Sequence, residues 1–114
     1  MNVTEYRQAI ARDMNETTLQ TKVEMAAREL GWLFYHTHDS RRSQAGFPDC
    51  VFLHPTGGRL IVRELKSMKG TASAEQKKWL AGFQAAGVDA GIWRPIDYLN
   101  ETVLNTLMQT RSTP

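Results

Sequence analysis

The sequence predicts an α/β fold in which a mixed sheet of about four strands is flanked by helices on both faces. Three observations predict it. Helix-like and strand-like patterns follow one another in the order α-α-β-β-β-α-β-α. A Pro-Thr-Gly-Gly turn at 55–58 joins two of the strand patterns into a hairpin. The 114 residues are 41% hydrophobic and 23% charged, so we expect one domain over 1–114 with a core at about 15–107.

Two helices are expected in the N-terminal part, at 4–11 and at 15–30. The second has apolar residues at helical spacing and Gly31 directly after it, where a glycine commonly ends a helix. Its start has two interpretations for Glu16. Asp13 and Glu16 fit a capping box, and Glu16 also fits, together with Gln20, a polar pair that faces the sheet from this helix and adds an acid to the site.

Four segments are expected to be strands, at 32–36, 49–54, 59–66 and 88–94. The first is rich in aromatic residues, and the second and third are the two arms of the hairpin. The polar segment at 37–47 between the first two strands is expected to be a loop.

Two further helices are expected in the C-terminal half. Ser73 and Gln76 form a capping-box pattern ahead of a helix that ends at Gly87. Its aromatic residues Trp79 and Phe83 are interpreted as core side chains, as is Trp32 at the start of the first expected strand. Asp97 is expected to cap the last helix, which follows Pro95.

The composition excludes several classes of protein. The lone Cys50 rules out an intrachain disulfide and a cysteine-rich zinc site. The chain has no apolar stretch near the roughly 18 residues that span a membrane, and no signal-peptide pattern. We therefore expect a cytoplasmic protein without membrane partners. Residues 36–94 carry nine basic and five acidic side chains, a net charge of +4, so this segment is the candidate anion-binding surface.

The chemically informative motif is Pro48-Asp49 followed by Glu64-Leu65-Lys66. Side chains alternate along a strand, so Glu64 and Lys66 share a face, and the hairpin brings Asp49 close to Glu64. Two adjacent carboxylates repel each other unless a proton or a cation lies between them. Mg²⁺ suits such a site, where it would acidify a water molecule and stabilise charge on a phosphate. Lys66 would orient that water, accept its proton or stabilise the developing charge.

The alternative is that Pro48 merely starts a strand and that Glu64 and Lys66 form a surface ion pair. However, both residues lie on the strand face that Leu60 and Val62 mark as apolar. Placing charged groups there is costly without a function.

A wider set of residues resembles a known family, the virus-type replication-repair nuclease (VRR-NUC) domain, a branch of the PD-(D/E)XK nuclease superfamily. The resemblance covers about 15–107. The matching positions are Gly46-Phe47-Pro48-Asp49, Glu64-Leu65-Lys66, Gly70, Ser73, Gln76, Trp79 and the segment Trp93-Arg94-Pro95.

The resemblance implies a metal-dependent endonuclease with the PD-(D/E)XK fold. Asp49, Glu64 and the backbone carbonyl of Leu65 would bind Mg²⁺ or Mn²⁺, and Lys66 would serve the attacking water. Small stand-alone members, often encoded by phages, are homodimers associated with branched DNA such as four-way junctions. No small-molecule cofactor is implied.

Other polar residues are candidates for contacts with catalytic groups or with DNA. Gln76 fits a hydrogen bond near the lysine and the substrate, in addition to its place in the capping box. Loop residues Arg41, Arg42 and Ser43 would clamp a DNA backbone, and His36 would contact a phosphate. The alternatives are solvated arginines and, for the pair His36 and His38, a zinc site.

Lys69 and Lys77 follow the motif and would extend this DNA-binding track, although each is also compatible with a solvated surface. Apolar residues of the first and last helices are candidates for a homodimer contact. These residues are Tyr6, Ile10, Val103, Leu107 and Met108.

The function predicted from the sequence is a Mg²⁺-dependent DNA endonuclease acting in phage or bacterial recombination, repair or replication. A nucleic-acid-binding module that kept the fold without catalysis is the alternative. A structural or interaction domain is a third possibility, but it leaves Glu64 and Lys66 unexplained.

Overall fold

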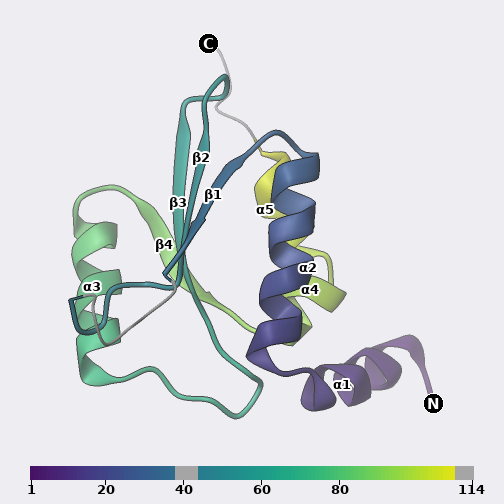
Figure 1. The fold of residues 1–114 in the computed structure, drawn as a ribbon. Coiled ribbons are helices and arrows are strands. Elements are labelled where there is room, and N and C mark those ends of the chain that lie inside the picture. Colours follow the sequence, from purple (N-terminus) through teal and green to yellow (C-terminus); the bar gives the residue numbers. More distant parts are fainter. Residues whose placement is uncertain (38–43, 110–114) are drawn as a thin grey trace.

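A computed structural model describes residues 1–37 and 44–109 of the chain (Figure 1). Helices and strands follow one another in nearly the expected order. They are α1 (Val3–Asp13), α2 (Glu16–Glu29), β1 (Leu33–His36), β2 (Cys50–His54), β3 (Arg59–Leu65), α3 (Ala74–Ala85), β4 (Asp89–Trp93), α4 (Pro95–Leu99) and α5 (Thr102–Met108).

The four strands form one mixed sheet in the order β1-β2-β3-β4. β1 pairs with β2 and β2 with β3 in antiparallel fashion, whereas β4 runs parallel to β3. The predicted hairpin is confirmed, and Cys50 of β2 lies opposite Arg63 of β3. The next register position along this ladder brings Asp49 opposite Glu64, which places the two acids at one end of the sheet.

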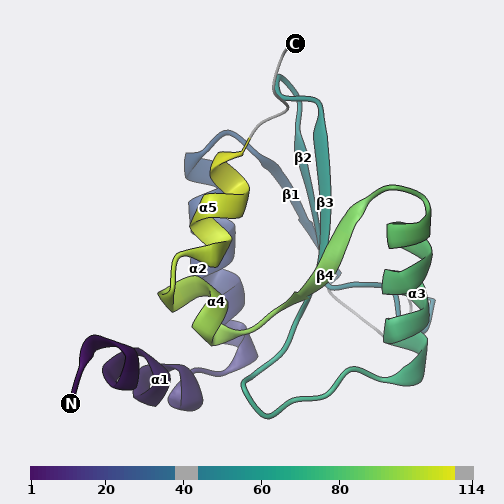
Figure 2. The same ribbon diagram turned by 180° about the vertical axis from the view of Figure 1, so that it is seen from behind.

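Helices cover both faces of the sheet, as predicted. α2, α4 and α5 lie on one face and α3 on the other, and α1 extends from the body beside α4 (Figures 1 and 2). The main core forms between the sheet and α2, α4 and α5. Its fully buried apolar side chains include Leu19, Val23, Phe52, Ile61, Val103 and Leu107.

The buried side of α2 follows from its sequence. Leu19, Val23 and Ala27 recur every four residues and are completely buried. The helix is capped by Asn15, whose side chain accepts a hydrogen bond from the backbone N–H of Thr18 at 2.8 Å. The predicted Asp13–Glu16 capping box is therefore wrong, because Asp13 is still the last residue of α1.

The single last helix predicted from the sequence is in fact two helices. Glu101, between α4 and α5, has a φ of 71°, a left-handed conformation that breaks the helix. Asp97 is also not the capping residue itself. Its carboxylate, in the first turn of α4, accepts a hydrogen bond from the backbone N–H of Arg94, the N-cap residue, at 2.7 Å.

Aromatic side chains were expected in the core. This prediction is confirmed for Trp32 and wrong for Trp79 and Phe83. Trp32 is buried, and its Nε1 donates to the carbonyl of Leu107 at 2.9 Å. On α3, in contrast, only Leu80 is buried, and Trp79 and Phe83 are half-buried. α3 packs against β3 and β4 with its buried side, which leaves its aromatic flank in contact with solvent.

Within the described ranges, no helix is both long enough and apolar enough to cross a membrane.

Candidate active site

A cleft of about 310 Å³ opens at the end of the sheet where Asp49 and Glu64 meet. It is formed by the start of α2, the end of β1, the adjoining end of the β2–β3 ladder and the start of α3. Most of the site residues predicted from the sequence line this cleft. Its lining consists of Glu16, Thr17, Gln20, His36, Asp49, Glu64, Leu65, Lys66 and Gln76.

Asp49 is fixed by the strand opposite it. Its Oδ2 accepts a hydrogen bond from the backbone N–H of Leu65 at 2.9 Å. The preceding Pro48 is completely buried, and the carbonyl of Asp49 accepts from the backbone N–H of Thr37. The carboxylate is therefore held against the end of β3, next to Glu64, as the hairpin predicts.

Glu64 is the most deeply buried acid of the site, with 2% of its surface exposed. Its Oε1 accepts a hydrogen bond from Nε2 of Gln76 at 2.9 Å, and its buried Oε2 has no hydrogen-bond partner. Burial, followed by the hydrogen bond that the protonated acid makes to Asp49 and by the charge of Asp49, raises the pKa of Glu64 to about 8, although the charge of Lys66 opposes this. The charge of Lys66 thus does not compensate for burial beside Asp49, and Oε2 of the carboxylate is left without a donor.

Gln76 completes the predicted capping box and also reaches a residue of the catalytic motif. Its Oε1 accepts from the backbone N–H of Ser73 at 2.8 Å, and its own N–H donates to the hydroxyl of Ser73, which completes the capping box. Because the oxygen of the amide is used in the cap, the NH₂ group points to Glu64. The start of α3 therefore sets the direction of this carboxylate.

Lys66 and Glu16 approach the acids from two sides. Nζ of Lys66 lies 3.9 Å from Oε1 of Glu64, and the lysine is half-buried. Glu16 lines the cleft from α2 but is exposed. Within 1–37 and 44–109, no three His, Cys, Asp or Glu residues are close enough together to hold a metal ion, so Glu16 does not join Asp49 and Glu64 as a third ligand.

Comparison with known families agrees with this geometry. A model of the VRR-NUC domain matches residues 4–94. The chain belongs to the VRR-NUC domain family. A solved structure described as a VRR-NUC domain superposes with a TM-score of 0.66 at 17% identity, over 78% of this chain and 94% of that chain. No curated protein matches the sequence.

The VRR-NUC assignment confirms the predicted fold class, a nuclease-type α/β fold with a four-stranded mixed sheet. The glycine that opens the family-like motif has a structural reason. Gly46 has a φ of +86°, and a Cβ at this position would lie 2.6 Å from the carbonyl carbon of Glu75. Only glycine lets the loop before Pro48-Asp49 press against the first turn of α3 in this way.

The residues predicted to bind DNA differ in their placement. His36 lines the cleft, whereas Lys69 and Lys77 lie outside its lining and are exposed. Arg41, Arg42 and Ser43, like the second histidine of the suggested zinc pair, His38, lie outside the described residues.

Two residues contribute to the site without having been predicted from the sequence, Thr17 and Arg94. Thr17 lines the cleft beside Glu16, as does Gln20, which was expected together with Glu16 to face the sheet. Arg94 has a structural role, because its Nη1 donates to the carbonyls of Ser67 and Gly70, both at 2.6 Å. It thereby holds the turn that follows Lys66. No local sequence pattern predicts this contact between β4 and that turn.

The buried Cys50 lies close to the site but is not a candidate nucleophile. Burial, with further contributions from the charges of Asp49 and Glu64, raises the pKa of its thiol well above the usual range. The thiol therefore stays protonated and unreactive at neutral pH.

Proposed function

We propose that this VRR-NUC protein is a metal-dependent endonuclease that hydrolyses phosphodiester bonds in DNA. The observation that carries the proposal is the buried carboxylate of Glu64, whose Oε2 has no partner while Asp49 lies beside it. An unpartnered buried oxygen is costly in a folded protein, and a bound cation removes that cost.

The donor set fits Mg²⁺ or Mn²⁺. Asp49 and Glu64 offer hard carboxylate oxygens, which such cations prefer. Leu65 would add its carbonyl, because the N–H and C=O of one strand residue point to the same side and its N–H already faces Asp49. Few protein ligands suffice, since Mg²⁺ retains several waters. When bound, the ion supplies positive charge that acidifies the attacking water and stabilises the charge on the phosphate.

The remaining side chains position these groups. Gln76 holds Oε1 of Glu64, which leaves the buried Oε2 without a donor and able to bind a cation. Lys66 keeps an ammonium group near the same carboxylate, where it would orient the water and counter negative charge at phosphorus.

We propose branched DNA, such as a four-way junction, as the preferred substrate, on the basis of the family resemblance. Lys69 and Lys77 would contact the phosphates that flank the cleft, because both are exposed and available. Replacing both lysines with alanine should weaken binding of all DNA sequences about equally and reduce the salt dependence by roughly two units of slope. An unchanged slope would place the phosphate contacts elsewhere.

We also propose a homodimer, which would place two active sites against two strands. Tyr6 and Ile10 on α1 are exposed and available for such a contact, as is Met108. Val103 and Leu107 were predicted as part of this surface, but they are buried in the chain's own core. Light scattering at micromolar concentration should give about twice the mass of one chain, and Tyr6→Glu should reduce it to that of a monomer.

The direct test is cleavage of plasmid DNA and of a four-way junction with and without Mg²⁺. Asp49→Ala, Glu64→Ala and Lys66→Ala should each nearly abolish cleavage and keep the circular dichroism spectrum. The two carboxylate variants should also lose Mn²⁺ binding in calorimetry, whereas Lys66→Ala should retain most of it. Binding of DNA without any cleavage by the unmodified protein would instead support the non-catalytic alternative.

A further inference from the structure

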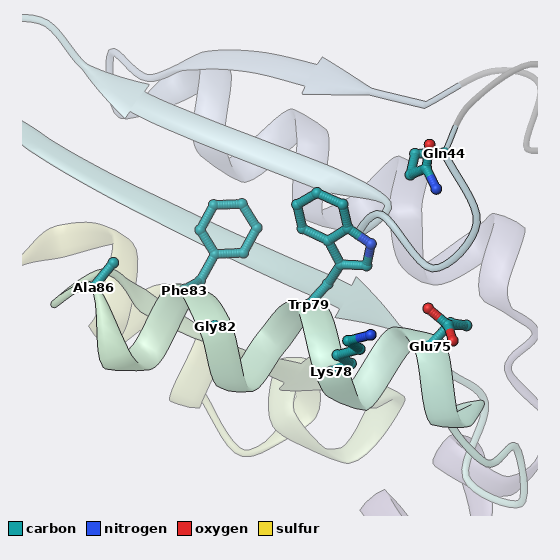
Figure 3. Close-up of a pocket in the computed structure, with 7 residues that line it drawn as sticks. All are labelled: Gln44, Glu75, Lys78, Trp79, Gly82, Phe83 and Ala86. Atoms are coloured by element: carbon teal, nitrogen blue, oxygen red, sulfur yellow. The ribbon is translucent and has the colours of Figure 1, made fainter.

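A second cavity, of about 520 Å³, lies along the exposed flank of α3 (Figure 3). We call it the α3 cavity. Its lining combines two aromatic rings with polar and charged side chains. The residues that matter here are Gln44, Glu75, Lys78, Trp79, Gly82 and Phe83.

The aromatic rings are held in place before any ligand arrives. Nε1 of Trp79 donates to the carbonyl of Ala45 at 3.1 Å, and Phe47 packs edge-on against the Trp79 ring at 5.3 Å. Phe83 lies 6.1 Å from Trp79, with the two rings tilted by 36°. Figure 3 shows both rings rising from the same flank of the helix. Two fixed rings that remain half-buried offer a stacking surface at little entropic cost.

The rim of the cavity suits a flat ring with a polar edge. Lys78 donates hydrogen bonds, Glu75 accepts them, and Gln44 does both. A purely apolar ligand would leave these groups unused, whereas a nucleobase presents a π-face to the rings and donors and acceptors to the rim.

Consecutive residues in the first turn of α3 line the α3 cavity and the catalytic cleft. Glu75 lines the cavity, while the adjacent Gln76 lines the cleft and donates to Glu64. A DNA strand whose phosphate occupies the cleft therefore has a neighbouring nucleotide within reach of Trp79.

We infer that the α3 cavity binds an unpaired nucleobase beside the phosphate that is cleaved. The inference rests on the proposed function and adds a basis for substrate choice. A base inside a duplex is stacked on its neighbours and cannot enter the cavity unless it is flipped out. DNA with unpaired nucleotides at the cleavage position is thus favoured over continuous duplex.

Gly82 allows the cavity to be filled without disturbing the fold. A Cβ at this helical position meets no atom within 4 Å, so Gly82→Leu places its side chain in the cavity. Leucine also favours a helix more than glycine does, which protects folding. Ala81→Leu is the matched control, because Ala81 is exposed on the same helix and lies outside the cavity lining.

The measurement is binding in EDTA, where no cleavage occurs. The probes are a short single-stranded oligonucleotide of mixed sequence, the same strand with abasic sugars, and a duplex of equal length. The unmodified protein should bind the normal strand about tenfold more tightly than the abasic strand, a difference of ~1.4 kcal/mol. Gly82→Leu should lose that preference and keep duplex binding within about twofold, whereas Ala81→Leu should behave like the unmodified protein.

Four results would overturn the inference, and the last of them would also contradict the proposed function. Equal binding of the normal and abasic strands by the unmodified protein contradicts base stacking and leaves the proposed nuclease function intact. If Gly82→Leu keeps the preference for the normal strand, the base binds elsewhere. If Gly82→Leu keeps that preference and its mass in light scattering falls from that of a dimer to that of a monomer, the cavity binds a second copy of the chain. Failure of the unmodified protein to bind the three probes and a four-way junction contradicts the proposed function itself.

Discussion

Two neighbouring residues of β3 carry buried charges that differ in how well the fold pairs them. Arg63 and Glu64 are 7% and 2% exposed, and they point to opposite faces of the sheet. Arg63 lies over the Trp93 ring and pairs with Asp89 at 2.8 Å, and Asp89 also pairs with Arg59 at 2.6 Å. Partial burial acts to raise the pKa of Asp89, but its bonds to the two arginines outweigh burial and lower the pKa.

Glu64 lacks such internal compensation. One oxygen is bonded to Gln76, the other has no partner, and burial next to Asp49 raises the pKa to about 8. The comparison shows how structural and functional charges differ in this chain. The arginine–aspartate cluster is satisfied by the fold, whereas Oε2 of Glu64 has no donor among the described residues.

The largest expected effect is on the cleavage rate, which should depend on Glu64 in the cleft and not on Asp89 in the arginine–aspartate cluster. Glu64→Gln should reduce the cleavage rate by about a thousandfold or more, because the neutral amide cannot help to hold Mg²⁺. Asp89→Asn should change the rate per folded molecule by less than about threefold. Initial rates on a four-way junction at a temperature where both variants are folded provide the measurement. Similar losses in both variants would contradict the division.

Stability should show the reverse order. Asp89→Asn leaves Arg63 buried without its partner and should lower the free energy of unfolding by about 2–3 kcal/mol. Glu64→Gln should not destabilise the metal-free protein, since its amide can accept from Gln76 and donate toward Asp49. Urea unfolding at pH 8 measures both values. A larger loss for Glu64→Gln would show that the acid stabilises the fold.

The pH dependence of stability should have opposite signs in the two regions. Glu64 has a raised pKa in the folded state, so the folded protein binds more protons between about pH 4.5 and 8, and stability falls as the pH rises through this window. Asp89 has a lowered pKa, so its contribution is present at neutral pH and is lost as the pH falls through the folded-state pKa.

Metal-free unfolding curves between pH 3 and 9 test these signs. Glu64→Gln should flatten the loss between pH 5 and 8, which we expect to be on the order of 1–2 kcal/mol. Mn²⁺ should restore stability at pH 8 in the unmodified protein and not in this variant. A stability that rises with pH across this window in the metal-free protein would rule out the raised pKa.

The smallest expected effect is on the cleavage rate when the N-terminal cap of α3 at Ser73, which adjoins the Gln76 contact to Glu64, is removed. Ser73→Ala removes the hydroxyl that accepts from the backbone N–H of Gln76, which costs about 1 kcal/mol and loosens the turn from which the Gln76 amide holds Glu64, although the backbone N–H of residue 73 still donates to that amide. Asn2→Ala removes a comparable cap from α1, where the side chain accepts from the N–H of Glu5. Only the Ser73 variant should lose cleavage rate, by roughly fivefold, with KM little changed. Equal rates in the two variants would limit Ser73 to a role in folding.

Local patterns were sufficient to predict much of the fold and the centre of the site. The four-residue spacing of Leu19, Val23 and Ala27 indicated the buried side of α2, and the Ser73–Gln76 pattern located the start of α3. The strand period and a tight turn together brought Asp49 to Glu64. These features depend on residues that are close in sequence or joined by one short turn, so periodicity and turn chemistry determine them.

Other features were decided only by the tertiary structure. The break at Glu101, the exposed flank formed by Trp79 and Phe83, and the hold of Arg94 on the turn after Lys66 have no local signal. The unpartnered oxygen of Glu64 likewise depends on how α2, β3 and α3 converge. The amount of surface that one element covers on another, and the polar groups left without partners, follow from packing between distant segments. Periodicity can therefore indicate which face of a helix is apolar, but the packing decides how much of that face remains exposed.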